Sequence, residues 1–225
     1  EIMPSLVGSE MCIRDRAYED FTTYTEVDSA NDYITVSTNA ITQTSRRDYD
    51  GYVYKDKGAG HFGDFEHLYD IKCTWGEQYN WGPTWMLANA VDDEYGLRGS
   101  AEKYLCVSFN WFNTGKHIVL RYYDGSTANE ERSSTTPSDN TWYYLKIKRD
   151  GSTLYCYIYS DSSRTNLLET LSLTADTTTY RYIFACNTYN SGVIREFTVN
   201  TQYLDLQEAQ EYYQTCTETM TCSDS

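Results

Sequence analysis

The sequence is poor in proline, in basic residues and in long apolar runs. Only 3 of its 225 residues are proline, and 18 Lys and Arg stand against 33 Asp and Glu, which gives a formal net charge of −15. Such a charge repels nucleic-acid phosphates and anionic membrane surfaces, so we expect no nucleic-acid partner. No apolar run approaches the roughly 20 residues of a membrane-spanning helix, so we expect no membrane insertion.

Short sequence motifs for metal binding or nucleophilic catalysis are also absent. The chain has 3 histidines, no Cys-x-x-Cys pair and no nucleophile-elbow pattern, so nothing indicates a structural zinc site or a Ser-His-Asp triad. His67 lies on an otherwise apolar strand face and is expected to be a hydrogen-bonded core histidine. His61, in the Gly-rich loop GAGHFGD, is free to contact a ligand.

Cysteine, in contrast, is present throughout the chain. Four cysteines lie in predicted strands, where a free thiol packs as a small hydrophobic group, and we expect them to be buried and unpaired. They are Cys73, Cys106, Cys156 and Cys186. Cys216 and Cys222 could close a small loop if the protein is secreted.

Residues 1–16, EIMPSLVGSEMCIRDR, differ in composition from the Tyr-, Thr- and Asp-rich chain that follows. They resemble translated sequencing adaptor, with the match running from Leu6 to Asp15, as expected of an assembled environmental (metagenomic) sequence. We therefore treat 1–16 as a non-native segment and leave them out of the fold prediction. The natural start is then missing, so a signal peptide can be neither identified nor excluded. We assign residues 17–206 to one domain and 207–225 to a tail or linker.

From residue 17 onward, apolar and polar residues alternate with period two between Gly, Asn, Asp and Ser. This pattern predicts an all-β chain, and its short turns without a long internal repeat predict two stacked antiparallel sheets. The expected strands are 19–26, 32–37, 39–44, 50–56, 63–75, 84–91, 103–112, 117–123, 141–149, 152–160, 167–173, 179–187 and 194–205.

The strongest local signal is Asp150-Gly151, between two alternating runs. A two-residue Asp-Gly loop supplies the positive φ angles of a tight hairpin. Alternation places Tyr143, Leu145 and Ile147 on one face with Leu154, Cys156 and Ile158, and this face is expected to be core.

This hairpin, TWYYLKIKRDGSTLYCYIYSD at 141–161, resembles that of concanavalin A-like and laminin-G-like jelly rolls. The segments 21–37 and 192–206 are similar to the first and last strands of those domains. The resemblance covers roughly 19–206. It implies a single jelly-roll sandwich in which the first and last strands pair.

Two carboxylates, Asp64 and Glu66, share one face of the strand 63–75 with Asp70. Strand neighbours two apart lie about 6.6 Å apart, which is compatible with the carboxyl separations of roughly 5–9.5 Å in glycosidases. They are the expected catalytic residues if the protein is an enzyme. The glucanases of this fold resemble one another in a Glu-x-Asp-x-x-Glu motif that DFEHLYD does not match, and a solvated acidic face remains the alternative.

The segment from Trp75 to Trp85 carries several large rings among Gly and Pro, and exposed rings suit the C–H faces of sugars. Tyr79, Trp81 and Trp85 are therefore candidate ligand-binding residues, whereas Trp75 is expected in the core. The alternative is that the rings cap the core at the end of the sandwich. Tyr155 and Tyr157 point outward from the hairpin and form a second candidate platform, or a surface for a protein partner.

The resemblance implies a calcium site, because laminin-G-like and legume-lectin-like domains often hold this ion in acidic loops. Asp92, Asp93 and Glu94 form one candidate cluster of ligands and Asp161 is another, with a solvated turn as the alternative. No defined ligand spacing is matched.

These observations favour a non-catalytic carbohydrate-binding, lectin-like module of a larger extracellular, cell-surface or virion protein, with a glycan as its partner. Two alternatives remain open. One is a glycoside hydrolase or polysaccharide lyase that uses the Asp64 and Glu66 face. The other is a structural module of a phage or surface assembly that binds only protein.

Overall fold

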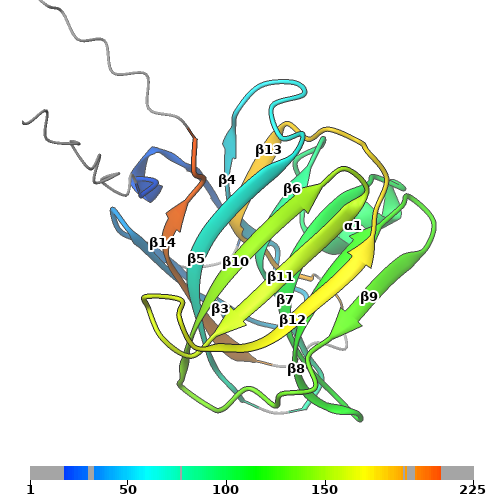
Figure 1. Cartoon of the computed structure of the whole chain (residues 1–225). Helices are drawn as coiled ribbons and strands as arrows, with labels where there is room; N and C mark the ends of the chain where they lie inside the picture. Colours follow the sequence, from blue (N-terminus) through cyan, green and yellow to red (C-terminus); the bar gives the residue numbers. More distant parts are fainter. Residues whose placement is uncertain (1–17, 30–32, 77, 190, 192–195, 209–225) are drawn as a thin grey trace, which may run out of the picture.

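The computed structural model describes residues 18–29, 33–76, 78–189, 191 and 196–208. They form two seven-stranded antiparallel sheets, sheet A and sheet B, stacked against each other (Figure 1). Sheet A has the order β1 (Thr25–Asp28), β4 (Gly51–Asp56), β13 (Tyr182–Cys186), β6 (Asn80–Ala88), β7 (Tyr104–Phe112), β8 (Gly115–Tyr123), β9 (Ala128–Arg132). Sheet B has the order β12 (Leu167–Thr174), β11 (Thr153–Tyr159), β10 (Trp142–Asp150), β5 (Phe65–Thr74), β14 (Phe197–Asp205), β3 (Ala40–Ser45), β2 (Ile34–Val36). The predicted all-β sandwich is confirmed.

Two elements were not expected from the sequence. The strand β9 is a polar edge strand, ANEER, and has no apolar alternation to reveal it. The helix α1 (Glu94–Gly99) is too short to show a helical period. In addition, the expected strand 19–26 begins with a short 3-10 turn, η1 (Phe21–Thr23), ahead of β1.

The expected pairing of the first and last strands is wrong. The last strand, β14, pairs with β3 and β5, while β1 pairs with β4 in the other sheet. The strand β3 therefore lies between β14 and the edge strand β2. The two ends of the domain still meet, because the backbone amide of Glu19 donates to the carbonyl of Leu204 at 2.7 Å.

The main core lies between the two sheets, and alternation along each strand decides which side chains enter it. In β7, Leu105 and Val107 face sheet B, whereas Tyr104 and Cys106 face outward from sheet A. The outward side chains form a second, smaller core beneath Leu97 of α1. The middle of sheet A is therefore covered on both faces.

The four strand cysteines are free and buried, as predicted. The adaptor-like segment 1–16 and the tail cysteines, Cys216 and Cys222, lie outside the described residues. Within the described part of the chain, no helix is long and apolar enough to cross a membrane.

The hairpin of β10 and β11 is confirmed, with Ile147 opposite Cys156 and both side chains buried. Because Asp150 pairs with Thr153, the two loop residues are Gly151 and Ser152, one position later than expected. Gly151 has φ of 57°, and open space surrounds the position that a Cβ would take. Backbone strain alone therefore makes glycine the favoured residue at this position.

We expect Gly151→Val to lower the free energy of unfolding by about 1–2 kcal/mol, the cost of a left-handed conformation for a residue with a Cβ. Urea denaturation measures this change. Gly63→Val is the matched control, because Gly63 also borders open space but has no left-handed φ. Equal effects of the two substitutions would contradict the role assigned to the backbone angle.

Candidate functional site

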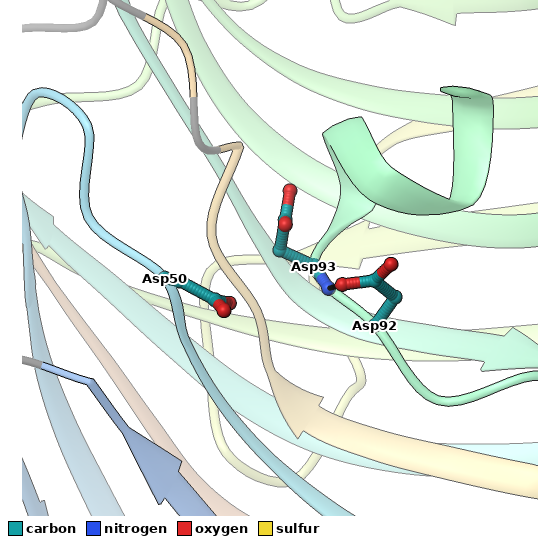
Figure 2. Close-up of side chains that lie close together, drawn as sticks. All are labelled: Asp50, Asp92 and Asp93. Atoms are coloured by element: carbon teal, nitrogen blue, oxygen red, sulfur yellow. Dashed lines mark hydrogen bonds between the residues drawn. The ribbon is translucent and has the colours of Figure 1, made fainter. Parts of the chain in front are cut away.

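Three carboxylates from two distant parts of the chain meet at one end of sheet A. Asp50 immediately precedes β4, and Asp92 and Asp93 immediately precede α1. Figure 2 shows the three side chains gathered around the segment that follows β13. One oxygen from each lies within 4.8 Å of the others, and we call this group the acidic cluster.

Local hydrogen bonds hold Asp92 and Asp93 in place. Asp93 is the N-cap of α1, and its Oδ1 accepts from the amides of Tyr95 at 2.7 Å and Gly96 at 3.1 Å. The Oδ1 of Asp92 accepts from the amide of Asp93 at 2.9 Å. The start of a helix thus brings two adjacent acids to one point.

The segment after β13 joins the two halves of the cluster. Asn187 Nδ2 donates to the carbonyl of Asp92 at 3.1 Å, and the Thr188 hydroxyl accepts from the amide of Gly51 at 3.0 Å. The carbonyl of Thr188 also accepts from the amide of Glu94 at 3.0 Å. These hydrogen bonds therefore hold the segment of Asp50 and the segment of Asp92 and Asp93 at a fixed separation.

The cluster carries unfavourable electrostatics in the absence of a cation. Burial raises the pKa of Asp93 to about 6, although its two amide hydrogen bonds lower it, and the charges of Asp50 and Asp92 raise it further. Burial and the charge of Asp92 also raise the pKa of Asp50. The Oδ1 of Asp50 is buried without a hydrogen-bond partner. Converging carboxylate oxygens with an orphaned acceptor fit the donor preference of a hard cation such as Ca²⁺.

Glu94 does not join the cluster, so its expected role as a ligand beside Asp92 and Asp93 is wrong. Its side chain is fully buried and turned under α1, where it accepts from the Tyr104 hydroxyl at 2.7 Å, the Trp81 indole and Arg121. The third carboxylate comes instead from Asp50, which sequence reasoning missed. Nothing local in the sequence places Asp50 near Asp93.

The expectation that Trp81 and Trp85 are exposed is also wrong. Both lie in β6, a central strand of sheet A, and they are 2% and 1% exposed. The Trp81 ring packs under the Arg121 guanidinium, 3.7 Å from the ring centroid, and the Trp85 indole donates to Nδ1 of His67 at 3.2 Å. These rings are core, and neither face is open to a sugar. Trp75 is core as predicted.

Two aromatic rings are nevertheless exposed: Tyr95, two residues after Asp93, and Tyr79, just before β6. Tyr95 of α1 is 53% exposed and packs edge-on against Tyr189, with ring centroids 5.4 Å apart. Beyond the buried Trp81 ring, Phe112 and Tyr79 continue the row, and Tyr79 is 41% exposed. We call Tyr79, Phe112, Tyr189 and Tyr95 the aromatic row, in which Phe112 and Tyr189 are partly buried against the main core. The ligand-binding role predicted for Tyr79 stays a prediction.

The other predicted residues lie away from this end of sheet A. His61, Asp64 and Glu66 line a cavity of about 430 Å³. His61 Nε2 lies 2.6 Å from Glu208, Asp64 accepts from the amide of Gly151 at 2.9 Å, and Glu66 lies 3.8 Å from Lys146. The catalytic role of Asp64 and Glu66 stays a prediction.

His67 is a core histidine, as predicted: it is 1% exposed, and burial lowers its pKa to about 3. Tyr155 and Tyr157 point outward from sheet B, as predicted, with ring centroids 6.0 Å apart. Lys146 Nζ lies 4.7 Å from the ring centroid of Tyr157. Their role as a platform stays a prediction.

No protein-family model matches the chain, and no curated protein matches it in sequence. Solved structures do match. The VIP36 exoplasmic/lumenal domain, in its Ca²⁺/Man3GlcNAc-bound form, aligns with a TM-score of 0.57 at 9% identity over 86% of this chain and 89% of that domain. A legume lectin-like domain from Entamoeba histolytica aligns with a TM-score of 0.54 at 15% identity, over 83% of this chain and 90% of that domain. The basic winged bean lectin with Tn-antigen aligns with a TM-score of 0.52 at 11% identity, over 83% of this chain and 95% of that lectin chain.

These likenesses confirm the concanavalin A-like lectin fold that the sequence predicted. At 9–15% identity they show the fold alone. The laminin-G part of the resemblance stays a prediction.

Proposed function

We propose that this chain is a non-catalytic, lectin-like glycan-binding module whose site is formed by the acidic cluster and the aromatic row. The observation that carries the proposal is the convergence of Asp50, Asp92 and Asp93 at the start of α1, the helix that also bears the exposed Tyr95. Sugars present C–H faces that pack on rings and hydroxyls that hydrogen-bond to oxygen acceptors, and this site offers both kinds of partner.

Calcium is part of the proposal. Asp50, Asp92 and Asp93 would hold Ca²⁺, which when bound supplies positive charge that neutralises their mutual repulsion. The chain's own residues position the site: Asp93 caps α1, and Asn187 and Thr188 tie the two acidic segments together. The Oδ1 of Asp50 would gain the partner it lacks.

The structural neighbours support the same proposal at a coarser level. The VIP36 domain has been solved in a Ca²⁺-bound form and in a Ca²⁺/Man-bound form. The basic winged bean lectin has been solved with Tn-antigen. We further propose that the module belongs to a larger extracellular, cell-surface or virion protein, in keeping with the lumenal domain of VIP36.

A glycan array probed with the 225-residue chain, once with Ca²⁺ and once with a chelator, tests the function. We expect specific glycans to be bound with Ca²⁺ and lost on chelation. Asp92→Asn should abolish this binding, because Asn keeps the acceptor for the Asp93 amide but removes the charge. Asp48→Asn is the matched control: Asp48 is an exposed acid near Asp50, and its φ of 51° is tolerated by Asn.

The outcomes separate the proposals. Binding that survives chelation would refute the calcium site while keeping the lectin. Absence of binding to every glycan would refute the lectin. Release of shorter saccharides from a polysaccharide would favour the enzyme alternative, which Glu66→Gln would then abolish.

Tyr95→Ala should weaken glycan binding by about 1–3 kcal/mol, a range taken from ring stacking on other flat partners, while leaving the melting temperature unchanged. Calorimetric titration with a glycan found on the array measures this loss. Trp81→Ala is unsuitable for the test, because Trp81 is buried and its removal leaves a cavity. Unchanged affinity of Tyr95→Ala would remove Tyr95 from the site.

A further inference from the structure

A second cavity of about 360 Å³ lies on the outer face of sheet B, on the other side of the sandwich from the acidic cluster. Leu68 and Asp70 of β5 contribute to its lining, and their side chains alternate with the buried Tyr69 and Ile71 that face the core. Its remaining walls come from the loop joining β11 to β12 and from the two ends of the domain, at Tyr18 and Tyr203. Figure 1 shows that loop, in yellow-green, extending beside the sheet toward β14.

Two exposed rings form one wall. Tyr18 is 42% exposed and Tyr203 is 37% exposed, and their ring centroids lie 5.0 Å apart with the planes inclined at 52°. Both belong to the small set of large hydrophobic side chains exposed in the described part of the chain. A paired, inclined ring wall beside a cavity offers a packing surface for an apolar face of a ligand.

An ion pair also lines the cavity. The Arg164 guanidinium donates from Nη2 to Asp70 Oδ1 at 2.7 Å and from Nε to the carbonyl of Leu145 at 3.1 Å. Both charged side chains are at least nine-tenths buried. Charge and position are fixed before any ligand arrives, and the pair is neutral as a whole.

The backbone is strained at the two residues that matter most for this cavity. Arg164 and Tyr203 each have φ of 54°, in the left-handed region that side-chain-bearing residues seldom adopt. Asp161 supports the loop conformation at Arg164 by accepting from the amides of Thr165 at 3.1 Å and Asn166 at 2.6 Å. Strained residues of this kind concentrate where a side chain must be held in a defined place for binding.

We infer that this cavity is a second saccharide site, which takes a neutral pyranose with vicinal hydroxyls and needs no metal ion. Of the five guanidinium N–H groups of Arg164, three donate to Asp70, Leu145 and Ser162, so two are left on Nη1 and Nη2 for two adjacent hydroxyls of the sugar. Tyr18 and Tyr203 pack against the C–H face of the ring. The overall neutrality of the pair and the acidic chain disfavour a uronic acid or another anionic ligand.

Amide NMR of the full chain in the presence of a chelator tests the inference, because chelation removes the proposed calcium site from the measurement. The probes are the methyl glycosides of mannose, glucose and galactose, and N-acetylglucosamine, at up to about 50 mM, which half-saturates a site with a Kd of that size. Glucuronate at the same concentration is the anionic comparison. We expect at least one probe to shift the amides of Ser162, Ser163, Arg164 and Tyr203 in a saturable way. Tyr18→Ala should weaken that binding about fivefold.

Two further variants complete the test. Arg164→Lys keeps the charge beside Asp70 but loses the planar donor fork, so binding should weaken while the fold is retained. Leu167→Ala removes another exposed side chain outside the cavity and should change nothing. The inference is overturned if none of the four probes shifts those amides, if Tyr18→Ala binds as the parent does, or if only glucuronate produces the shifts. Each of these results leaves the calcium-dependent site untouched.

Discussion

Arg121→Met is expected to lower the free energy of unfolding by about 3–5 kcal/mol. Arg121 is 6% exposed and forms an ion pair with the fully buried Glu94, which also accepts from Tyr104 and Trp81. Burial alone would lower the pKa of Arg121, yet the charge of Glu94 holds it above its ordinary value. Removing the guanidinium leaves a buried carboxylate without its counter-charge, and urea denaturation reports the loss.

The control for this substitution lies on the neighbouring strand. Arg132 pairs with Glu130 at 3.0 Å but is 40% exposed, so Arg132→Met should cost less than about 1 kcal/mol. The double variant Glu94→Gln with Arg121→Met should regain part of the loss, because it removes the stranded charge. If Arg121→Met costs no more than Arg132→Met, the buried pair does not anchor α1 to sheet A.

The parts of the fold that follow from local alternation were predictable. The hairpin around Gly151 is one example, because a period of two assigns Ile147 and Cys156 to the core face whatever the rest of the chain does. The buried, unpaired cysteines follow from the same argument. In contrast, β9 carries no apolar alternation, and the pairing of β14 with β3 is decided by the topology of the whole sheet.

The candidate site was predicted only in part, for two physical reasons. The expected strand began only at residue 84, after Gly82 and Pro83, but β6 begins at Asn80 and accommodates the proline at a bulge, where its register with β7 shifts between Pro83 and Trp85. Trp81 and Trp85 consequently lie in a central strand and are buried. The acidic cluster depends on Asp50, whose segment meets Asp92 only because β13 lies between β4 and β6 in sheet A. Such contacts between distant segments leave no local sequence signal.

Calcium is expected to stabilise the chelated protein markedly near pH 7.5. An ion that binds only the folded chain adds about 2.7 kcal/mol to the free energy of unfolding when it is present at 100 times its Kd. For a chain of this size that corresponds to a rise of roughly 5–10 °C in the melting temperature. Thermal denaturation with and without a chelator measures the rise, and Asp92→Asn should remove it while Asp48→Asn keeps it. If the melting temperature of the parent chain does not change on addition of Ca²⁺, the proposed calcium site at the acidic cluster is wrong.

The stabilisation by calcium should weaken as the pH falls, whereas the stability of the calcium-free chain should change with pH in the opposite direction. With a pKa of about 6, Asp93 is mostly protonated at pH 5, so calcium affinity should fall about tenfold from its value at pH 7.5. Without calcium, the free energy of unfolding should depend on pH in the opposite sense. Because the pKa of Asp93 is raised to about 6 in the folded chain, its protonated form stabilises the fold. This contribution is complete below the unfolded-state pKa of about 3.9 and is lost as the pH rises through about 6. Asp93→Asn retains an N-cap residue for α1 and should flatten both profiles. If the chelated parent chain instead gains stability as pH rises from 4 to 6 relative to Asp93→Asn, then Asp93 is not the buried, repelled carboxylate that the acidic cluster requires.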